Sequence, residues 1–279
     1  MPKAKIIFSD YDEAAGIETK PDGSRIVDIH EFDLNKMWPL SPDDVGHGVK
    51  ICITAKPGRG KSRIIEQIML YKSWICPIAQ VYSGTESVNG FYGQKVTPVT
   101  VFDELDAKQI ELFVKRQSIA QKYLPNAWAM LIIDDCIDSP STLRNSPHPA
   151  FFRKSRHFSS IRVDASQYPM DLPAGIRSCI DYLFIPQNSL ISERQKLYEN
   201  FASGAIPSFK DFCDLMDQVT GDYCALVIDN TSTSQIISER IFYFKADLSK
   251  VPSDFKMGCP EAWAFNNERV DPNYQESFL

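Results

Sequence analysis

The chain has 279 residues, of which 43% are hydrophobic and 24% charged, and its net charge is −6. This composition is typical of a globular protein, and no apolar run approaches the roughly 20 residues of a membrane-spanning helix. The acidic balance argues against a protein that coats nucleic acid, so any contact with DNA must use a local basic patch. The seven cysteines form no Cys-x-x-Cys pair and the four histidines lack metal-ligand spacing, which favours a reducing compartment and no zinc site.

Three regions follow one another along the chain. Residues 1–47 mix polar turns with short apolar pieces, and we expect an N-terminal extension that packs on the core and could supply a strand. The main domain is expected over 48–250, followed by a C-terminal tail over 251–279. Within the main domain, apolar runs alternate with stretches of helical periodicity, which predicts an α/β sheet with right-handed crossovers.

Apolar runs bounded by turn residues predict the core strands. They lie at 49–54, 78–82, 128–133, 161–167 and 181–185, with a further short candidate at 99–102. Helices are predicted directly after the first strand and at about 106–123, 189–201 and 208–219. The chain closes with an antiparallel pair at 224–229 and 236–244. Asp164 interrupts one of the core runs, which is unusual for a buried strand.

The segment after the first core strand combines glycines with a lysine and a serine. It reads Ala55-Lys56-Pro57-Gly58-Arg59-Gly60-Lys61-Ser62. Between a strand and a helix, such a segment predicts a phosphate-binding P-loop (Walker A), whose backbone N–H groups surround the phosphates of ATP. Lys61 would reach the β- and γ-phosphates, and the Ser62 hydroxyl would ligate Mg²⁺. Ala55 replaces the usual first glycine of the motif. The alternative interpretation of the whole segment is a surface turn that arose by chance.

Two acids, Asp134 and Asp135, follow the apolar run at 128–133. This is the Walker B arrangement, in which Asp134 would hold Mg²⁺ directly or through water and Asp135 would polarise the attacking water. An acidic loop after a core strand is the alternative. Gln167 ends the next strand, where its side chain can hydrogen-bond the attacking water or the γ-phosphate, although a glutamine before a turn is also common. Together with the P-loop, these residues predict an ATP hydrolase.

Several further motifs make the chain similar to a known family. They are Ser83-Gly84-Thr85-Glu86, Asn89-Gly90-Phe91-Tyr92-Gly93, Asp134-Asp135-Cys136, Arg156-His157, Ser166-Gln167-Tyr168-Pro169-Met170-Asp171-Leu172-Pro173, Ile176-Arg177-Ser178, Asp181-Tyr182-Leu183-Phe184, Phe212-Cys213, Met216-Asp217-Gln218-Val219-Thr220 and Leu226-Val227-Ile228-Asp229-Asn230. In combination, they make residues 48–246 resemble the poxvirus-type genome-packaging ATPases of large nucleocytoplasmic DNA viruses, which belong to the FtsK–HerA division of P-loop motors. The resemblance implies a RecA/FtsK-like P-loop fold with a mainly parallel sheet, flanking helices and antiparallel C-terminal strands.

The resemblance also implies a homo-oligomeric ring that uses ATP to move double-stranded DNA into a preformed capsid. Such a protein would act in the host cytoplasm, at the site of viral assembly, or in the virion, with a capsid or portal-vertex protein as a further partner. In such rings, an arginine of the neighbouring subunit stabilises charge on the transferring phosphoryl group. Arg156 and Arg177 match family positions; we favour Arg156, and a surface arginine or structural ion pair is the alternative for each. Asp164 departs from the apolar or small residue of the family.

Two other functions stay open at this stage. The first is a cellular-type DNA pump or helicase of the same superfamily. The second is a nucleotide-dependent assembly protein, in which ATP only holds subunits together and the side chains of Asp135 and Gln167 are idle. The pair Phe91 and Tyr92 could stack on bases, but such aromatic residues more often fill a core or a subunit interface.

Overall fold

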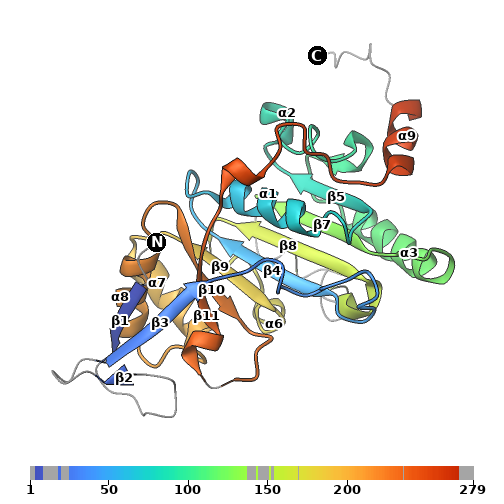
Figure 1. Ribbon diagram of the computed structural model, residues 1–279. Helices are drawn as coiled ribbons and strands as arrows, with labels where there is room; N and C mark the ends of the chain where they lie inside the picture. The colour runs from blue at the N-terminus through green and yellow to red at the C-terminus, as the bar shows by residue number, and fades with distance from the viewer. Residues whose placement is uncertain are drawn as a thin grey trace.

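The computed structural model describes residues 4–8, 18–19, 25–136, 143, 151, 154–168, 170–234 and 236–269. Its strands are β1 (Ala4–Phe8), β2 (Glu18–Thr19), β3 (Arg25–Glu31), β4 (Val49–Thr54), β5 (Ile78–Ser83), β6 (Val101–Phe102), β7 (Ala129–Asp134), β8 (Ser160–Ser166), β9 (Tyr182–Pro186), β10 (Cys224–Asp229) and β11 (Ile241–Lys245). Its helices are α1 (Lys61–Lys72), α2 (Glu86–Asn89), α3 (Ala107–Tyr123), α6 (Ala174–Arg177), α7 (Ile191–Leu197), α8 (Phe209–Val219) and α9 (Pro260–Arg269). The strands join one sheet in the order β1-β3-β11-β10-β9-β4-β8-β7-β5-β6, with β2 beside β3 (Figure 1).

The sheet is parallel in its centre and antiparallel toward the C-terminal strands. The strands β6, β5, β7, β8, β4 and β9 run parallel to their neighbours. The strands β9, β10 and β11 alternate in direction, and β3 of the N-terminal region pairs with β11. The predicted α/β fold, with a mainly parallel sheet and antiparallel C-terminal strands, is confirmed. The P-loop strand β4 lies inside this sheet, between β8 and β9.

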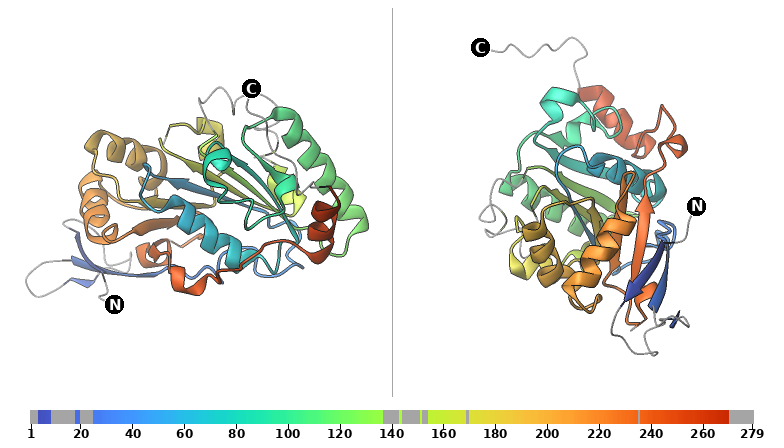
Figure 2. Two further views of the ribbon diagram at one scale, coloured as in Figure 1. Left: turned by 90° about the horizontal axis from the view of Figure 1, so that it is seen from above. Right: turned by 90° about the vertical axis from the view of Figure 1, so that its left-hand side faces the viewer.

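Helices cover both faces of the sheet because the central strands bury apolar side chains on each side. On one face, Ile64 and Ile68 of α1 pack with side chains of β4, β7 and β8. On the opposite face, Ile110 and Phe113 of α3 cover β5 and β7, while α7 and α8 cover β9 and β10. Figure 2 shows the helices on the two sides of the sheet. This packing fixes α1, and therefore the loop before it, against the strand ends.

The unusual Asp164 is explained by its neighbour on β8, Arg162. Residues two apart on a strand share a face, so both side chains point away from the face that carries Val163. The Arg162 guanidinium donates two hydrogen bonds to the Asp164 carboxylate, from Nε at 2.8 Å and from Nη2 at 2.9 Å, and both side chains are fully buried. A bidentate pair of this kind satisfies the carboxylate, which allows an acid in a core strand.

Three predicted elements are shorter than expected. The helix expected at 189–201 is α7 followed by a π-helical turn over Tyr198–Ala202. The strand expected at 236–244 begins only at Ile241, because Ile237–Glu239 form a 3₁₀ turn after a hydrogen bond from the Ile236 N–H to the Ser234 hydroxyl. Such side-chain bonds to the backbone compete with strand pairing. The strand expected at 99–102 is reduced to β6, because Pro98–Thr100 form another 3₁₀ turn.

The C-terminal region contacts the main domain over much of its described length. Met257 is fully buried, and its N–H donates to the carbonyl oxygen of Lys95 at 2.7 Å. The N–H of Cys259 donates to the carbonyl oxygen of Pro77 at 2.7 Å, and α9 follows directly. The division into 48–250 and 251–279 stays a prediction. No helix within the described ranges is long and apolar enough to cross a membrane.

Candidate active site

The candidate site lies where the parallel strands end. In the sheet register, Thr54 at the end of β4 pairs with Ser166 at the end of β8. Asp134 at the end of β7 pairs with Ala165 of β8 and with Ser83 of β5. Since parallel strands share one carboxyl edge, the P-loop, the two acids and Gln167 come together there, as the sequence predicts. Gln167 is half-buried and follows β8 instead of belonging to it.

The P-loop has the backbone conformation that its glycines permit. Gly58 and Gly60 have φ values of 75° and 88°, in the left-handed region that favours glycine. Gly60 precedes α1, which carries no side-chain cap and no acidic residue in its first turn. The first N–H groups and the positive end of the helix dipole are therefore available to an anion. Ala55 lies outside this curve, because it is buried and its N–H donates to the carbonyl oxygen of Ser166 at 3.1 Å.

Side chains on the outer part of the loop are tied to the segment after β9. The Arg59 guanidinium donates from Nη1 to Oε1 of Gln187 at 2.7 Å. Lys56 forms a longer ion pair with Glu193, with 3.5 Å between Nζ and Oε1. Pro57 is exposed between them. These contacts fix the outside of the loop, while Lys61 and Ser62 extend from its inner end.

Lys61 forms an ion pair with Asp135 at this edge. The lysine side chain is only 6% exposed, whereas that of Asp135 is 22% exposed and lines a cavity. Asp135 has a φ of 51°, an uncommon conformation for a residue other than glycine, and such positions cluster at functional sites. Gly84 lies against it: a Cβ at Gly84 would come within 2.9 Å of the Asp135 carbonyl oxygen. Only glycine therefore fits at position 84 without a shift of the backbone.

Asp134 is held by a hydrogen bond from Tyr92, a residue to which the sequence analysis assigns no catalytic role. The Tyr92 hydroxyl donates to Oδ2 of Asp134 at 2.8 Å, and both residues are buried. Burial and the nearby carboxylate raise the pKa of Tyr92, so its hydroxyl stays a hydrogen-bond donor. The carboxylate of Glu86 accepts from the N–H groups of Tyr92 at 2.9 Å and Gly93 at 2.7 Å, which fixes the loop that carries the tyrosine.

The second oxygen of Asp134 fits a magnesium ligand. Oδ1 is buried and has no hydrogen-bond partner within the described residues. Burial raises the pKa of Asp134, whereas Lys61 and the hydrogen bond from Tyr92 act in the opposite direction. No group of three or more His, Cys, Asp or Glu side chains suited to a metal occurs in the described ranges. Mg²⁺ in nucleotide sites needs only one or two protein ligands besides phosphate and water, so Asp134 and the half-buried Ser62 suffice.

A cavity of about 560 Å³ opens beside the P-loop. One side is formed by the P-loop and the start of α1, and the other by Tyr223, Lys245, Ala246 and Leu248. Motif reasoning misses Tyr92 and this second wall. Tyr92 belongs to a motif of the resemblance, but its contact with Asp134 spans 42 positions of the chain. No local pattern marks Tyr223, whose left-handed backbone is a property of the fold.

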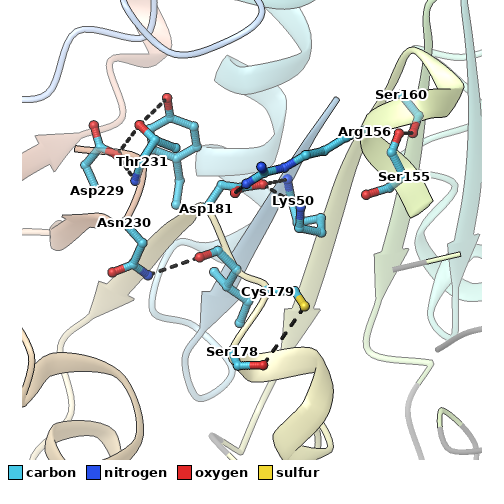
Figure 3. A network of polar contacts seen from close by, with 12 residues as sticks. Lys50, Ser155, Arg156, Ser160, Ser178, Cys179, Asp181, Asp229, Asn230 and Thr231 are labelled. Carbon is cyan, nitrogen blue, oxygen red and sulfur yellow. Dashed lines mark hydrogen bonds and ion pairs between the residues drawn. The ribbon is translucent and has the colours of Figure 1, made fainter. Parts of the chain in front are cut away.

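Arg156 lies at the other end of the strands. It belongs to a 3₁₀ turn, Ser155–Phe158, just before β8, so roughly 20 Å of strand separates it from the P-loop edge. Figure 3 shows it beside Asp181, with 3.3 Å between Nη2 and Oδ1, and its side chain is 63% exposed. Lys50 holds the other oxygen of Asp181 through Nζ at 2.8 Å and through its N–H at 2.9 Å. The structure therefore does not bring Arg156 to Lys61 of the same chain.

Arg177, the second candidate arginine, is hydrogen-bonded to two residues of its own chain. Nη1 donates to the carbonyl oxygen of Leu172 at 2.6 Å, and Nη2 donates to Oδ1 of Asn200 at 2.9 Å. Partial burial lowers the pKa of Arg177. These two bonds leave Arg177 less available to another molecule than Arg156. The adjacent motif residue Pro169 lies outside the described residues.

The strand order, the P-loop and the acids at the end of β7 define a P-loop NTPase fold. Similar solved structures include the genome packaging NTPase B204 from Sulfolobus turreted icosahedral virus 2 in complex with ATP-gammaS. Its TM-score is 0.53 at 14% identity, over 72% of this chain and 98% of that chain. The pCW3 conjugation coupling protein TcpA with ATPgS has a TM-score of 0.54 at 13% identity, over 85% of this chain and 78% of that chain. At these identities, the likeness shows the fold alone.

Sequence relatives of this chain come from viruses. The chain is 42% identical over 253 residues to uncharacterized protein 088R of Invertebrate iridescent virus 3, covering 88% of this chain and 96% of the relative. It is 34% identical over 253 residues to uncharacterized protein 075L of Invertebrate iridescent virus 6, covering 89% of this chain and 97% of the relative. The chain belongs to the same protein family as these two iridescent virus proteins. A scan of described protein families finds no match.

Proposed function

We propose that the protein is an ATP-hydrolysing motor that translocates double-stranded DNA and packages a viral genome into a preformed capsid. The observation that carries the hydrolytic part is the arrangement at the carboxyl edge. There, Lys61, Asp134 and Asp135 lie together beside an uncapped helix N-terminus, and one buried oxygen of Asp134 has no partner in the described residues. This combination supports binding of a nucleoside triphosphate with Mg²⁺.

The pairing of Lys61 with Asp135 suggests how nucleotide binding prepares hydrolysis. A bound triphosphate would compete for the Lys61 ammonium and thereby release the Asp135 carboxylate. The freed carboxylate can then accept a proton from the attacking water. Half-buried Gln167 would orient that water from the end of β8. When bound, Mg²⁺ would neutralise charge on the phosphates, held by the Ser62 hydroxyl and the free oxygen of Asp134.

Arg156 would complete the site of a neighbouring subunit. Because it is exposed at the amino edge of its own sheet, it can reach a P-loop only in another copy of the chain. An interface that joins the amino edge of one subunit to the carboxyl edge of the next is heterologous, and such interfaces form a ring when the rotation between neighbouring subunits closes. We therefore propose a homo-oligomeric ring with Arg156 as the arginine in trans and Arg177 as the weaker candidate.

The DNA-translocating part rests on likeness and on the motifs. B204 is by its name a genome packaging NTPase, TcpA is a conjugation coupling protein, and the sequence relatives belong to viruses. Packaging is preferred over conjugation because the family is viral. Double-stranded DNA and a capsid or portal-vertex protein are the proposed partners, in the host cytoplasm or the virion. A poxvirus-type relationship is part of this proposal.

The test is phosphate release from ATP, measured with and without duplex DNA. We expect turnover that rises with DNA in the wild type and falls by about 10³-fold or more in Lys61→Ala and Asp135→Asn. Lys108→Ala is the control, because Lys108 is exposed at the start of α3. A wild type that binds ATP and assembles without releasing phosphate would favour the assembly protein instead.

A further inference from the structure

The cavity beside the P-loop has a second wall that takes no part in phosphate chemistry. The P-loop side carries Lys61 and Ser62, which suit the triphosphate. The second wall consists of the aromatic ring of Tyr223 and the side chains of Lys245, Ala246 and Leu248. At about 560 Å³, the cavity is within the usual range for a ligand of nucleotide size. The cavity is therefore large enough for a nucleoside to contact the second wall while its phosphates lie on the P-loop.

Tyr223 is held in a conformation that has an energetic cost. Asp222 and Tyr223 have φ values of 52° and 59°, so two successive residues other than glycine adopt the left-handed region immediately before β10. The tyrosine is nevertheless 67% exposed, so burial does not compensate for this conformation. Its ring stands close to the P-loop, because a Cβ at Gly60 would lie 3.7 Å from Cδ1 of Tyr223. Strain of this kind, next to a cavity, is typical of binding positions.

An ion pair stabilises the turn that carries the tyrosine. Lys245 of β11 pairs with Asp222, and Lys245 lies opposite Cys224 in the β10–β11 register. The hydrogen bond that the Lys245 ammonium donates to the Asp222 carboxylate raises the pKa of Lys245, so the lysine stays charged. Lys245 is thus engaged by Asp222, and the other residues of this wall, Tyr223, Ala246 and Leu248, give the cavity an aromatic and apolar surface. Such a surface suits a flat base better than a phosphate group.

We propose that the Tyr223 ring is the platform on which the base of the bound nucleotide stacks. This inference rests on the proposed function, since it places the triphosphate on the P-loop. Stacking on an aromatic ring is available to every base, and in the rest of this wall only Lys245, which already pairs with Asp222, has a side chain that can hydrogen-bond a base edge. The site therefore takes nucleoside triphosphates without strong selection among the bases, and ATP and GTP bind with affinities within roughly tenfold of each other.

Calorimetric titration of the full chain with ATP, GTP and inorganic tripolyphosphate tests the proposal. The main variant is Tyr223→Gly, because glycine accepts the left-handed backbone and removes only the ring. We expect it to bind ATP and GTP about 5- to 100-fold more weakly and tripolyphosphate unchanged. Tyr223→Phe should bind all three ligands like the wild type. Tyr123→Ala, which removes an exposed tyrosine at the end of α3, is the matched control.

The outcomes separate this inference from the function on which it rests. Unchanged ATP affinity in Tyr223→Gly overturns the stacking platform, while nucleotide binding to the P-loop stands. An equal loss of ATP and tripolyphosphate affinity also overturns it, because the variant would then act on the phosphate end. A wild type that binds neither ATP nor tripolyphosphate contradicts both proposals. Lys61→Ala, which should lose both ligands, shows that the tripolyphosphate reports on the P-loop.

Discussion

Charged pairs lie at both edges of the sheet. The carboxylate oxygens have hydrogen-bond partners at the amino edge but only in part at the carboxyl edge. At the amino edge, Asp181 accepts two bonds from Lys50 on one oxygen and a bond from Arg156 on the other. At the carboxyl edge, Asp134 leaves one buried oxygen without a partner in the described residues, and Asp135 faces a cavity. The amino edge therefore stabilises the fold, whereas the carboxyl edge has binding capacity left for a ligand.

The comparison also distinguishes the residues at the amino edge. Lys50 is buried and makes two bonds to one oxygen of Asp181, whereas Arg156 adds a single contact of 3.3 Å to the other oxygen from an exposed side chain. An ion pair with one exposed partner contributes about 1 kcal/mol or less to stability. Arg156 can thus leave Asp181 at small cost and act elsewhere. Under the proposed ring, Arg156 of one subunit faces the P-loop edge of the next subunit.

The largest expected effect is that of Arg156→Ala on hydrolysis. Losing an arginine that acts in trans should lower DNA-stimulated phosphate release by about 10³-fold or more. The free energy of unfolding should change by about 1 kcal/mol or less, since the arginine side chain is exposed and Lys50 still holds Asp181. Parallel turnover and urea unfolding measurements check both. Arg177→Ala is the comparison variant, and full turnover in Arg156→Ala would remove this role from the amino edge.

Lys50→Met is expected to have the opposite profile. The variant loses the ammonium that pairs with the Asp181 carboxylate. Only the bonds from the backbone N–H of residue 50 and from Arg156 remain, which should lower the free energy of unfolding by about 3–5 kcal/mol. Nucleotide affinity of the folded protein should stay at the wild-type value. Urea unfolding and ATP titration measure the two quantities. If Lys61→Ala is destabilised as much as Lys50→Met, the two edges do not differ as described.

A smaller effect is expected for Tyr92→Phe. The change removes the hydrogen bond to Oδ2 of Asp134 and leaves the ring in place. Loss of a bond that orients a ligand should weaken Mn²⁺ binding, followed by electron paramagnetic resonance, by about tenfold. Tyr82→Phe is the control, because the Tyr82 hydroxyl is also buried but is bonded to Gln80. Equal Mn²⁺ affinity in Tyr92→Phe and the wild type would show that Tyr92 only fills the core.

The parts of the site that depend on neighbouring residues could be predicted from the sequence. The P-loop and Asp134-Asp135 each follow an apolar strand directly, so their position at a sheet edge follows from chain order alone. The Arg162–Asp164 pair was also within reach, because residues two apart on a strand share a face. When the pairing with Arg162 is overlooked, Asp164 looks like a departure from the family pattern. In the structure it is a buried acid with its hydrogen bonds satisfied.

Other parts depend on tertiary structure and leave no local signal. The bond between Tyr92 and Asp134 joins residues 42 positions apart, and only the folded loop around Glu86 creates it. The left-handed turn at Asp222 and Tyr223 depends on the pairing of Asp222 with Lys245 on the next strand. Arg156 is separated from Lys61 because it precedes β8, whereas Lys61 follows the parallel strand β4. A single motif does not contain this information.

Mixing two inactive variants tests the central claim, that the two edges build one site across subunits. Lys61→Ala lacks the P-loop lysine but keeps Arg156, whereas Arg156→Ala has the reverse defect. Random rings formed from equal amounts contain roughly a quarter of interfaces with both groups intact. DNA-stimulated phosphate release should therefore return to about a quarter of the wild-type rate. A mixture no more active than the two variants alone would contradict the shared site.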